Sequence, residues 1–505
     1  MEERVELSPK QIGLLHRMWL NVETTLNRIY RYNPLYHLHS LGVFLIWVAL
    51  FSGIYLFIFY KINPEGAYQS VKYLTEDQWW LGGIMRSIHR YGSDLLVIVM
   101  LLHLVKTFVT SRHGGWRKLA WVSGVFILWV VWICGIFGYW LVWDRKAQLI
   151  AVLSAEMLER IPIFGQPLSI SFSGAESLDA IFFYILFIMH FALTVFLFIL
   201  LWVHVSRIAS AKINPPLKVG LATLGLLLLY SLLFPAGLEP AADLKVLPAP
   251  VEIDWFFLFL YPPMKYISVP LMWLIIVGAT VLLALVPWLF PTKKELTASV
   301  ILKNCTGCEQ CVFDCPYEAV YMQQRTDGKP FNLEAVVSPK KCAGCAICMG
   351  ACDFDAISMQ GFTEKEFKEE IRALSQELAE AKDGPTLLVF ACRWGVDVSR
   401  HMDGINAKVL TVPCAGMVQP PMAELALNAG VDGVLISACA ENDCHYREGD
   451  ELLKQRFNGI RRPTFKTPVD KGRIKILFLA QTQQDEFAKR LKGFVEELRK
   501  RHSTT

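Results

Sequence analysis

The stretch RSIHRYGSDLLVIVMLLH at residues 86–103 places His89 and His103 fourteen positions apart in an apolar segment. A second apolar segment repeats this spacing with His190 and His204. Fourteen helical steps are almost four whole turns, so both histidines of a pair project from one face of their helix, about 21 Å apart along its axis. Two such helices side by side predict two bis-histidine haems stacked across a bilayer, and hence a transmembrane electron carrier. A single histidine could instead be a packed polar residue or a proton relay, but two matched pairs of costly intramembrane groups favour ligation.

The composition of the 505-residue chain divides it into an apolar half and a cysteine-rich half. Hydrophobic residues make up 53% of the chain, with their excess before residue 292, and the length suggests about three domains. Twelve of the thirteen cysteines follow residue 304 in tight clusters, which is typical of metal ligation in a reducing compartment. The net charge of +4 does not indicate nucleic-acid binding, and the first 35 residues show no cleavable signal peptide.

Six apolar segments are long enough to span a hydrocarbon core, which takes about 20 helical residues. A segment around 9–30 is expected to form an amphipathic helix at the membrane interface. Basic residues gather in the N-terminal segment and in the loops after the second and fourth spans, while the alternate loops are acidic or neutral. This asymmetry predicts that both termini are cytoplasmic. The expected spans are 39–60, 82–109, 118–142, 179–206, 217–236 and 268–291.

The first 291 residues resemble the cytochrome b of quinol-oxidising bc-type complexes. The likeness lies in Arg86 with the histidines of 86–103, in Gly124 and Gly138, and in the segments GYWLVWDRKAQ (138–148), LSAEMLERIPIFGQPL (153–168) and EPAADLKVLPAPVEIDWFFLFLY (239–261). The resemblance implies two b haems. His89 and His190 would hold the outer haem, and His103 and His204 the haem on the cytoplasmic side. Arg86 would neutralise a haem propionate, Gly53, Gly124 and Gly138 would leave room for the macrocycles, and quinone would be the substrate.

Several positions depart from the pattern of that family. The quinol motif reads Ile253-Asp254-Trp255-Phe256, so Asp254 stands where the family has a glutamate. Asp254 is the candidate acceptor of a quinol proton, and a loop-capping carboxylate is the alternative of nearly equal weight. His39 occupies the position of the glycine that should accompany Gly53, and Ile185 replaces an arginine. The apolar region also ends after six spans, whereas the family has eight.

The segment from Cys305 contains the spacing C-x-x-C-x-x-C-x-x-x-C twice. This is the pattern of bacterial ferredoxins, in which the fourth cysteine of each run binds the other [4Fe–4S] cluster. A pair of zinc sites is the alternative, which the doubled spacing disfavours. We expect a two-cluster ferredoxin domain over 296–361 and a helical linker over 362–385. The expected ligand sets are Cys305, Cys308, Cys311 and Cys352 for one cluster, and Cys342, Cys345, Cys348 and Cys315 for the other.

Residues 386–505 alternate short apolar runs with helical patterns, which predicts an α/β domain with a largely parallel sheet. The expected strands are 386–390, 408–413, 433–438 and 475–480, and a closing helix covers 484–501. Cysteines follow three of these strands, so they should converge at one edge of the sheet. Four thiolates suit one [2Fe–2S] cluster or one zinc ion. These candidate ligands are Cys392, Cys414, Cys439 and Cys444.

This last segment resembles the delta subunit of methyl-viologen-reducing hydrogenase. FACRWGVD (390–397), GVDGVLISAC (430–439) and ENDCHYREG (441–449) carry the likeness. The resemblance implies a [2Fe–2S] cluster that passes electrons to the flavin subunit of heterodisulfide reductase. Gly395 stands where that family often has a further cysteine. His445 is expected to cap a turn, with tuning of the cluster as the alternative.

Together these patterns predict a multi-domain membrane protein. A transmembrane all-α haem-binding bundle is followed by a small α+β ferredoxin domain and a C-terminal α/β domain. The expected function is electron transfer between the quinone pool and a cytoplasmic heterodisulfide-reductase-like complex. One alternative is the membrane anchor and relay subunit of a hydrogenase or dehydrogenase without its own quinone site, and another is a redox sensor. By analogy with the resembled family, a homodimer is expected.

Overall fold

The computed structural model describes residues 13–29, 33–161, 172, 178–206, 212–246, 254–292, 296–380 and 384–502. Within them the chain forms two units, one of residues 37–292 and one that combines residues up to 36 with residues from 293 onward. Ile253 and parts of the segments 153–168 and 239–261 lie outside the described residues.

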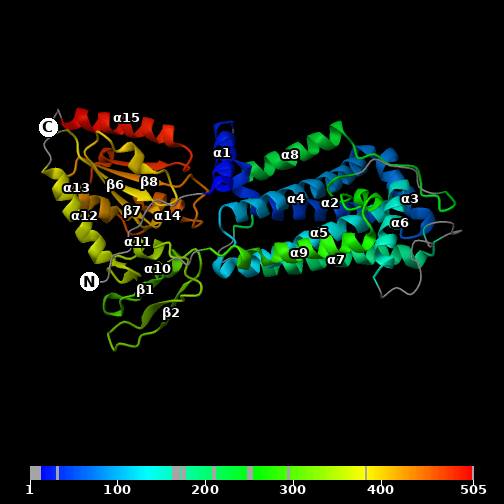
Figure 1. Cartoon of the computed structure of the whole chain (residues 1–505), viewed down its shortest axis with the longest axis horizontal. Coiled ribbons are helices and arrows are strands. Elements are labelled where there is room, and N and C mark those ends of the chain that lie inside the picture. The colour runs from blue at the N-terminus through cyan, green and yellow to red at the C-terminus, as the bar shows by residue number, and fades with distance from the viewer. Residues whose placement is uncertain are drawn as a thin grey trace. The chain divides into compact units, whose positions relative to one another are not determined.

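The unit of residues 37–292 is a bundle of long apolar helices (Figure 1). Five of them are long and apolar enough to cross a membrane, and α8 is apolar but has 17 residues. Helices therefore occupy all six predicted spans, and α5 has the predicted bounds. The helices are α2 (Leu38–Phe59), α3 (Pro64–Lys72), α4 (Ile84–Val109), α5 (Lys118–Val142), α6 (Arg145–Glu159), α7 (Ala180–Ser206), α8 (Leu217–Leu233) and α9 (Val269–Leu289).

Helix pairing within this unit brings the histidine-bearing helices together with glycine-bearing ones. Helix α2 packs against α4, and α5 packs against α7. Helix α4 carries His89 and His103, and α7 carries His190 and His204. Helix α8 packs against α4, and α9 packs against α5. The chain thus belongs to a multi-pass membrane protein whose described core is helical.

The second unit contains the ferredoxin segment, built from two short antiparallel sheets. One sheet has the order β1-β4-β5, and the other is the hairpin β2-β3. A four-residue helix lies in each cysteine motif and includes its third cysteine. The elements are β1 (Ala298–Val300), α10 (Gln310–Phe313), β2 (Val320–Gln324), β3 (Leu333–Val337), α11 (Ile347–Gly350), β4 (Ile357–Met359) and β5 (Phe362–Thr363).

Helix α12 (Glu364–Ala379) follows this segment and is part of the core. A capping box between Thr363 and Glu366 starts the helix. Its apolar residues Phe367, Ile371 and Leu378 are buried in a cluster shared with the ferredoxin segment and the C-terminal sheet. The expected linker is therefore a packed element that joins both parts into one core.

The C-terminal part is a four-stranded parallel sheet of order β7-β6-β8-β9 with helices around it (Figure 1). Strands β6 and β8 are buried along their whole length, as expected for a parallel sheet covered on both faces. The order reverses at β6, which makes β6 the topological switch point. The elements are β6 (Leu387–Cys392), β7 (Ala407–Val412), α13 (Pro420–Asn428), β8 (Gly433–Ala438), α14 (Gly449–Phe457), β9 (Ile474–Phe478) and α15 (Gln484–His502).

The N-terminal helix α1 (Leu14–Ile29) packs with this second unit. Leu20, Glu23 and Thr24 are buried, and Thr24 Oγ1 lies 2.7 Å from Thr482 Oγ1. The helix also exposes apolar residues: Leu14, Leu15, Met18 and Val22. The helix is amphipathic as predicted, but its Thr24 contacts protein, in the segment that follows β9.

Candidate redox sites

His89 on α4 and His190 on α7 face each other with ring centroids 6.3 Å apart. Nδ1 of His89 lies 2.9 Å from the carbonyl oxygen of Ala49, and Nδ1 of His190 lies 2.9 Å from that of Cys134. A bond from Nδ1–H to a carbonyl fixes the tautomer and leaves Nε2 free to bind a metal. The pair therefore fits the two axial ligands of one haem iron.

Glycines leave space beside both imidazoles. A Cβ atom at Gly53 would lie 3.0 Å from Cε1 of His89, and one at Gly138 would lie 3.3 Å from Cε1 of His190. A larger side chain would press on the imidazole of a candidate axial ligand and take up room that a macrocycle would need. The two glycines, Gly53 and Gly138, therefore fit a haem held between α4 and α7 by the first histidine pair.

In the second pair, His103 and His204, only His204 has a glycine beside its imidazole. Nδ1 of His204 lies 3.0 Å from Ser123 Oγ, and a Cβ atom at Gly124 would lie 3.4 Å from Cε1 of His204. On α2 the corresponding position holds His39, whose ring centroid lies 6.4 Å from that of His103. Three of the four positions thus offer glycine space for a macrocycle, and the fourth presents an imidazole.

Arg86 lies one turn before His89 and binds backbone carbonyls. Its Nη1 donates to the carbonyl oxygen of Ala236 at 2.6 Å, and its Nη2 donates to that of Gly237 at 2.9 Å. These bonds tie α4 to the segment that follows α8. Its role toward a haem propionate stays a prediction.

Asp254 lies in a charged cluster with α4 and α5. Its Oδ2 accepts hydrogen bonds from Arg90 Nη2 at 2.7 Å and from the Tyr139 hydroxyl at 2.5 Å. Its Oδ1 accepts from the backbone nitrogen of Phe256 at 2.7 Å. The last bond is the local turn that a capping aspartate makes. Asp94 completes the cluster, because its Oδ2 lies 3.5 Å from Arg90 Nε.

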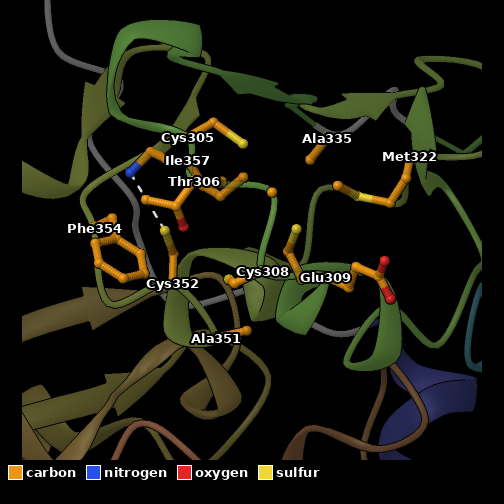
Figure 2. A pocket seen from close by; sticks show the side chains of 13 residues that line it. Cys305, Thr306, Cys308, Glu309, Met322, Ala335, Ala351, Cys352, Phe354 and Ile357 are labelled. Carbon is orange, nitrogen blue, oxygen red and sulfur yellow. Dashed lines mark hydrogen bonds between the residues drawn. The ribbon is translucent and has the colours of Figure 1, made fainter. Parts of the chain in front are cut away.

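The eight ferredoxin cysteines line two cavities. Each cavity takes three cysteines from one motif and the last cysteine of the other, as the sequence predicted. Figure 2 shows the sulfur atoms of Cys305, Cys308 and Cys352 pointing into the first cavity. The first cavity is lined by Cys305, Cys308, Cys311 and Cys352, and the second by Cys315, Cys342, Cys345 and Cys348.

The surroundings of these thiols suit iron–sulfur clusters. Burial raises the pKa of Cys311 to about 12 and that of Cys352 to about 11. Thiolates so placed require nearby cations, which the irons of a cluster supply. Backbone N–H groups of Ala319 and Ala356 donate to the sulfurs of Cys315 and Cys352 at 3.3 and 3.4 Å. Such bonds are among the groups that set a cluster's potential.

The four C-terminal cysteines meet at the carboxyl edge of the parallel sheet, at its switch point. Cys392 ends β6, Cys414 follows β7, and Cys439 follows β8. The sulfur of Cys392 lies 3.6 Å from that of Cys439, and the sulfur of Cys414 lies 3.8 Å from that of Cys444. All four are buried. The set fits a [2Fe–2S] cluster, and sulfurs about 2.3 Å from a tetrahedral zinc would have similar separations.

Aromatic rings stack next to this site. The rings of Trp394 and His445 are nearly parallel, with centroids 3.5 Å apart. Each follows a candidate ligand closely in sequence, Cys392 and Cys444 respectively. The stack therefore joins two of the loops that carry the thiols.

The C-terminal site lies beside the second ferredoxin cavity. The turn η9 (Ala415–Met417) directly follows Cys414 and packs against α11, which carries Cys348. A Cβ atom at Gly449 would meet Cys414 Sγ at 2.3 Å and Ile347 Cδ1 at 3.5 Å. The two sites are thus separated by little more than one layer of side chains.

A fully buried arginine holds this junction together. Arg456 forms an ion pair with Asp314 and donates to the carbonyl oxygens of Gly416 at 2.5 Å and Ile347 at 3.4 Å. Arg461 binds the other carboxylate oxygen of Asp314, at 2.6 Å from its Nε. These contacts connect both ferredoxin helices to the turn after Cys414.

Sequence reasoning missed Arg456, the Arg90–Asp94 pair and Lys106. Lys106 is buried and lies one turn after His103, just as Arg86 lies one turn before His89. That mirrored spacing was the available signal for Lys106. Nothing local in the sequence marks Arg456, because Asp314 is 142 positions away.

Three segments of the chain match three family models, in the predicted order. Residues 25–211 match the family described as cytochrome b/b6/petB, and residues 304–366 match the 4Fe-4S dicluster domain. Residues 387–501 match the family described as methyl-viologen-reducing hydrogenase, delta subunit. The matches confirm the predicted fusion and support haem b and iron–sulfur clusters as its cofactors.

Individual relatives resemble only parts of the chain. The menaquinol:cytochrome c reductase cytochrome b subunit of Geobacillus thermodenitrificans is 28% identical over 149 residues, which cover 28% of this chain and 66% of that protein. An iron-sulfur subunit of the F420-non-reducing hydrogenase from Archaeoglobus profundus is 28% identical over 123 residues, which cover 23% of this chain and 90% of that protein. One subunit of the ferredoxin:CoB-CoM heterodisulfide reductase from Methanosarcina mazei is 29% identical over 202 residues, which cover 39% of this chain and 24% of that protein.

Proposed function

We propose that this membrane electron-transfer protein connects the quinone pool to a cytoplasmic heterodisulfide-reductase-like complex. One observation carries the proposal. A single chain combines two intramembrane histidine pairs with three cysteine sites, and the soluble sites share one continuous core. Each of these modules serves electron transfer in the proteins it resembles, so their fusion indicates a continuous path.

The cofactors follow from the donor sets. His89 with His190 would hold one b haem, and His103 with His204 the second. The two ferredoxin cavities would hold one [4Fe–4S] cluster each, and the four C-terminal thiols one [2Fe–2S] cluster. When bound, these groups accept and release single electrons.

Contacts between the three cysteine sites suggest the order in which electrons would pass through them. The cavity of Cys342, Cys345 and Cys348 adjoins the C-terminal site through α11 and η9. The other cavity contains Cys308, which is exposed. We therefore place the second ferredoxin cluster between the first one and the [2Fe–2S] cluster. The first cluster then offers a surface terminal at Cys308, and the C-terminal domain offers one to the soluble partner.

The quinone end is proposed at the cluster of Asp254, Arg90 and Tyr139. Arg90 directly follows His89 in sequence, and the relative from Geobacillus is named for its use of menaquinol. Both termini would be cytoplasmic if α8 spans the membrane as a sixth helix. Its 17 residues are at the short end of the spanning range. Proteolysis of sealed, right-side-out vesicles should leave the C-terminal domain intact.

The test uses the purified full-length chain loaded with its cofactors. A short-chain quinol, added anaerobically, should change the absorbance of the b haems and then of the iron–sulfur clusters. His190→Ala should interrupt this electron transfer at the first haem. Haems that respond to a soluble low-potential donor but to no quinone or quinone analogue would instead identify a relay subunit without a quinone site. The direction of flow follows from the midpoint potentials, which a redox titration measures.

A further inference from the structure

Two buried carboxylates, Asp94 and Asp254, share one arginine beside the first histidine pair. Arg90 Nη2 lies 2.7 Å from Asp254 Oδ2, and Arg90 Nε lies 3.5 Å from Asp94 Oδ2. The guanidinium also stacks over the Tyr139 ring, 4.5 Å from its centroid. One cation therefore faces two carboxylates in a part of the protein where buried charge is costly.

The hydrogen bonds of Asp254 leave it little capacity for another proton. Its Oδ2 accepts from Arg90 and from the Tyr139 hydroxyl, and its Oδ1 accepts from the backbone of Phe256. Protonation would weaken the ion pair and compete with these bonds. Asp254 is thus arranged to remain a carboxylate that positions Arg90 and the following turn.

Asp94 has the opposite arrangement. Its Oδ2 faces Arg90 at a longer distance, and its Oδ1 accepts no hydrogen bond from the residues that the structure describes. Its side chain is 13% exposed, and the Oδ1 atom itself is buried. Buried carboxylate oxygens normally have a donor, so an orphaned one indicates a donor that comes from a ligand. Asp94 follows His89 by five residues on α4, about 7.5 Å along the helix axis.

We infer that Asp94, rather than Asp254, accepts the proton of a bound quinol hydroxyl, an inference that rests on the proposed quinone function. Oxidation of one quinol to quinone releases two electrons and two protons. One proton bonds to Asp94 Oδ1 as the quinol O–H bond breaks, and the second leaves to the solvent. The two electrons pass singly to the proposed first haem. Arg90 keeps its bond to Asp254 throughout, so the cation stays paired when Asp94 becomes neutral.

The assay follows haem absorbance in the purified full-length chain after addition of a short-chain naphthoquinol or benzoquinol. Asp94→Asn should slow quinol-driven haem reduction by about 100-fold, the usual contribution of a proton acceptor. Asp94→Glu should restore most of the rate. Asp254→Asn should stay within about tenfold of the wild type, because it loses a positioning contact and no proton acceptor. Dithionite-reduced spectra and haem midpoint potentials should be the same in all variants, which separates proton transfer from structural damage.

The outcomes are distinct. A wild-type protein whose haems respond to neither quinol overturns the proposed function and this inference together. If the wild-type haems respond to quinol but Asp94→Asn leaves the rate of haem reduction unchanged, the inference alone is overturned. The same holds if Asp254→Asn, and not Asp94→Asn, lowers that rate 100-fold. If Asp94→Asn does not bind both haems, infrared difference spectra decide instead. The protonated-carboxyl band formed with quinol should shift in Asp94→Glu, and a band that stays in place overturns the assignment.

Discussion

Replacing Gly449 by alanine should empty the C-terminal metal site and leave the other sites loaded. Gly449 begins α14, and a Cβ atom there would lie 2.3 Å from Cys414 Sγ and 3.1 Å from Cys444 Sγ. Non-bonded heavy atoms rest about 3.5–4.0 Å apart. The Cys414 sulfur would therefore have to retreat by more than about 1 Å. Metal–ligand distances tolerate only about 0.2 Å, so one of four ligands should be lost.

The assay is the iron content of the purified chain together with the electron paramagnetic resonance of its reduced clusters. We expect Gly449→Ala to lose the [2Fe–2S] signal while the haem and [4Fe–4S] signals remain. Gly493→Ala is the matched control, because a Cβ atom there meets nothing within 4 Å and alanine favours its helix. If Gly449→Ala keeps the full [2Fe–2S] signal, the four thiols do not form the site as described.

Three further changes test other parts of the protein. Gly53→Leu should reduce the haem b content from two to one per chain in a pyridine haemochrome assay, because the leucine side chain would crowd His89 in the first pair. Gly278→Leu is the control: a Cβ atom there meets nothing within 4 Å, so this variant should keep both haems. Arg456→Met should lower the free energy of unfolding of the cysteine-rich unit by about 3 kcal/mol, because Asp314 loses a buried partner; thermal bleaching of the clusters at an unchanged temperature would contradict this. Burial raises the pKa of Glu364 from 4.5 to about 8, so the folded state binds its proton more tightly, and the free energy of unfolding should fall between pH 4.5 and 8 by at most about 5 kcal/mol. Glu364→Gln should flatten that pH dependence in the same bleaching assay, and an equal slope in both proteins would refute the assignment.

The sequence predicted most of the fold because its strongest signals are periodic. Predicted spans and observed helices agree within a few residues at most ends, and the span 118–142 coincides with α5. The four predicted strands of the C-terminal domain correspond to β6, β7, β8 and β9. Histidine and cysteine spacing also predicted which residues gather, because the histidines recur after almost whole helical turns and the doubled cysteine spacing is the pattern of two-cluster ferredoxins.

The sequence could not predict the long-range polar contacts. The ion pair of Arg456 with Asp314 joins residues 142 positions apart, and neither has a sequence context that marks burial. The same holds for Asp254, which reaches Arg90 only when α4 meets the segment before α9; the Arg90–Asp94 pair, by contrast, is an i,i+4 contact within α4. Amphipathicity predicted α1 but not its partner, because one hydrophobic stripe fits a lipid surface or a protein surface equally well.

The packing of α1 has a consequence for the order of folding during synthesis. Thr24 contacts Thr482, which follows it by 458 positions. At about 5–20 residues per second, the ribosome needs roughly 25–90 seconds to cover that distance. Throughout this time the first helix exists without its final contact, while the membrane helices that follow it are already being made. The docking of α1 must therefore be among the last steps of maturation, and a chain that stops before Thr482 cannot complete it.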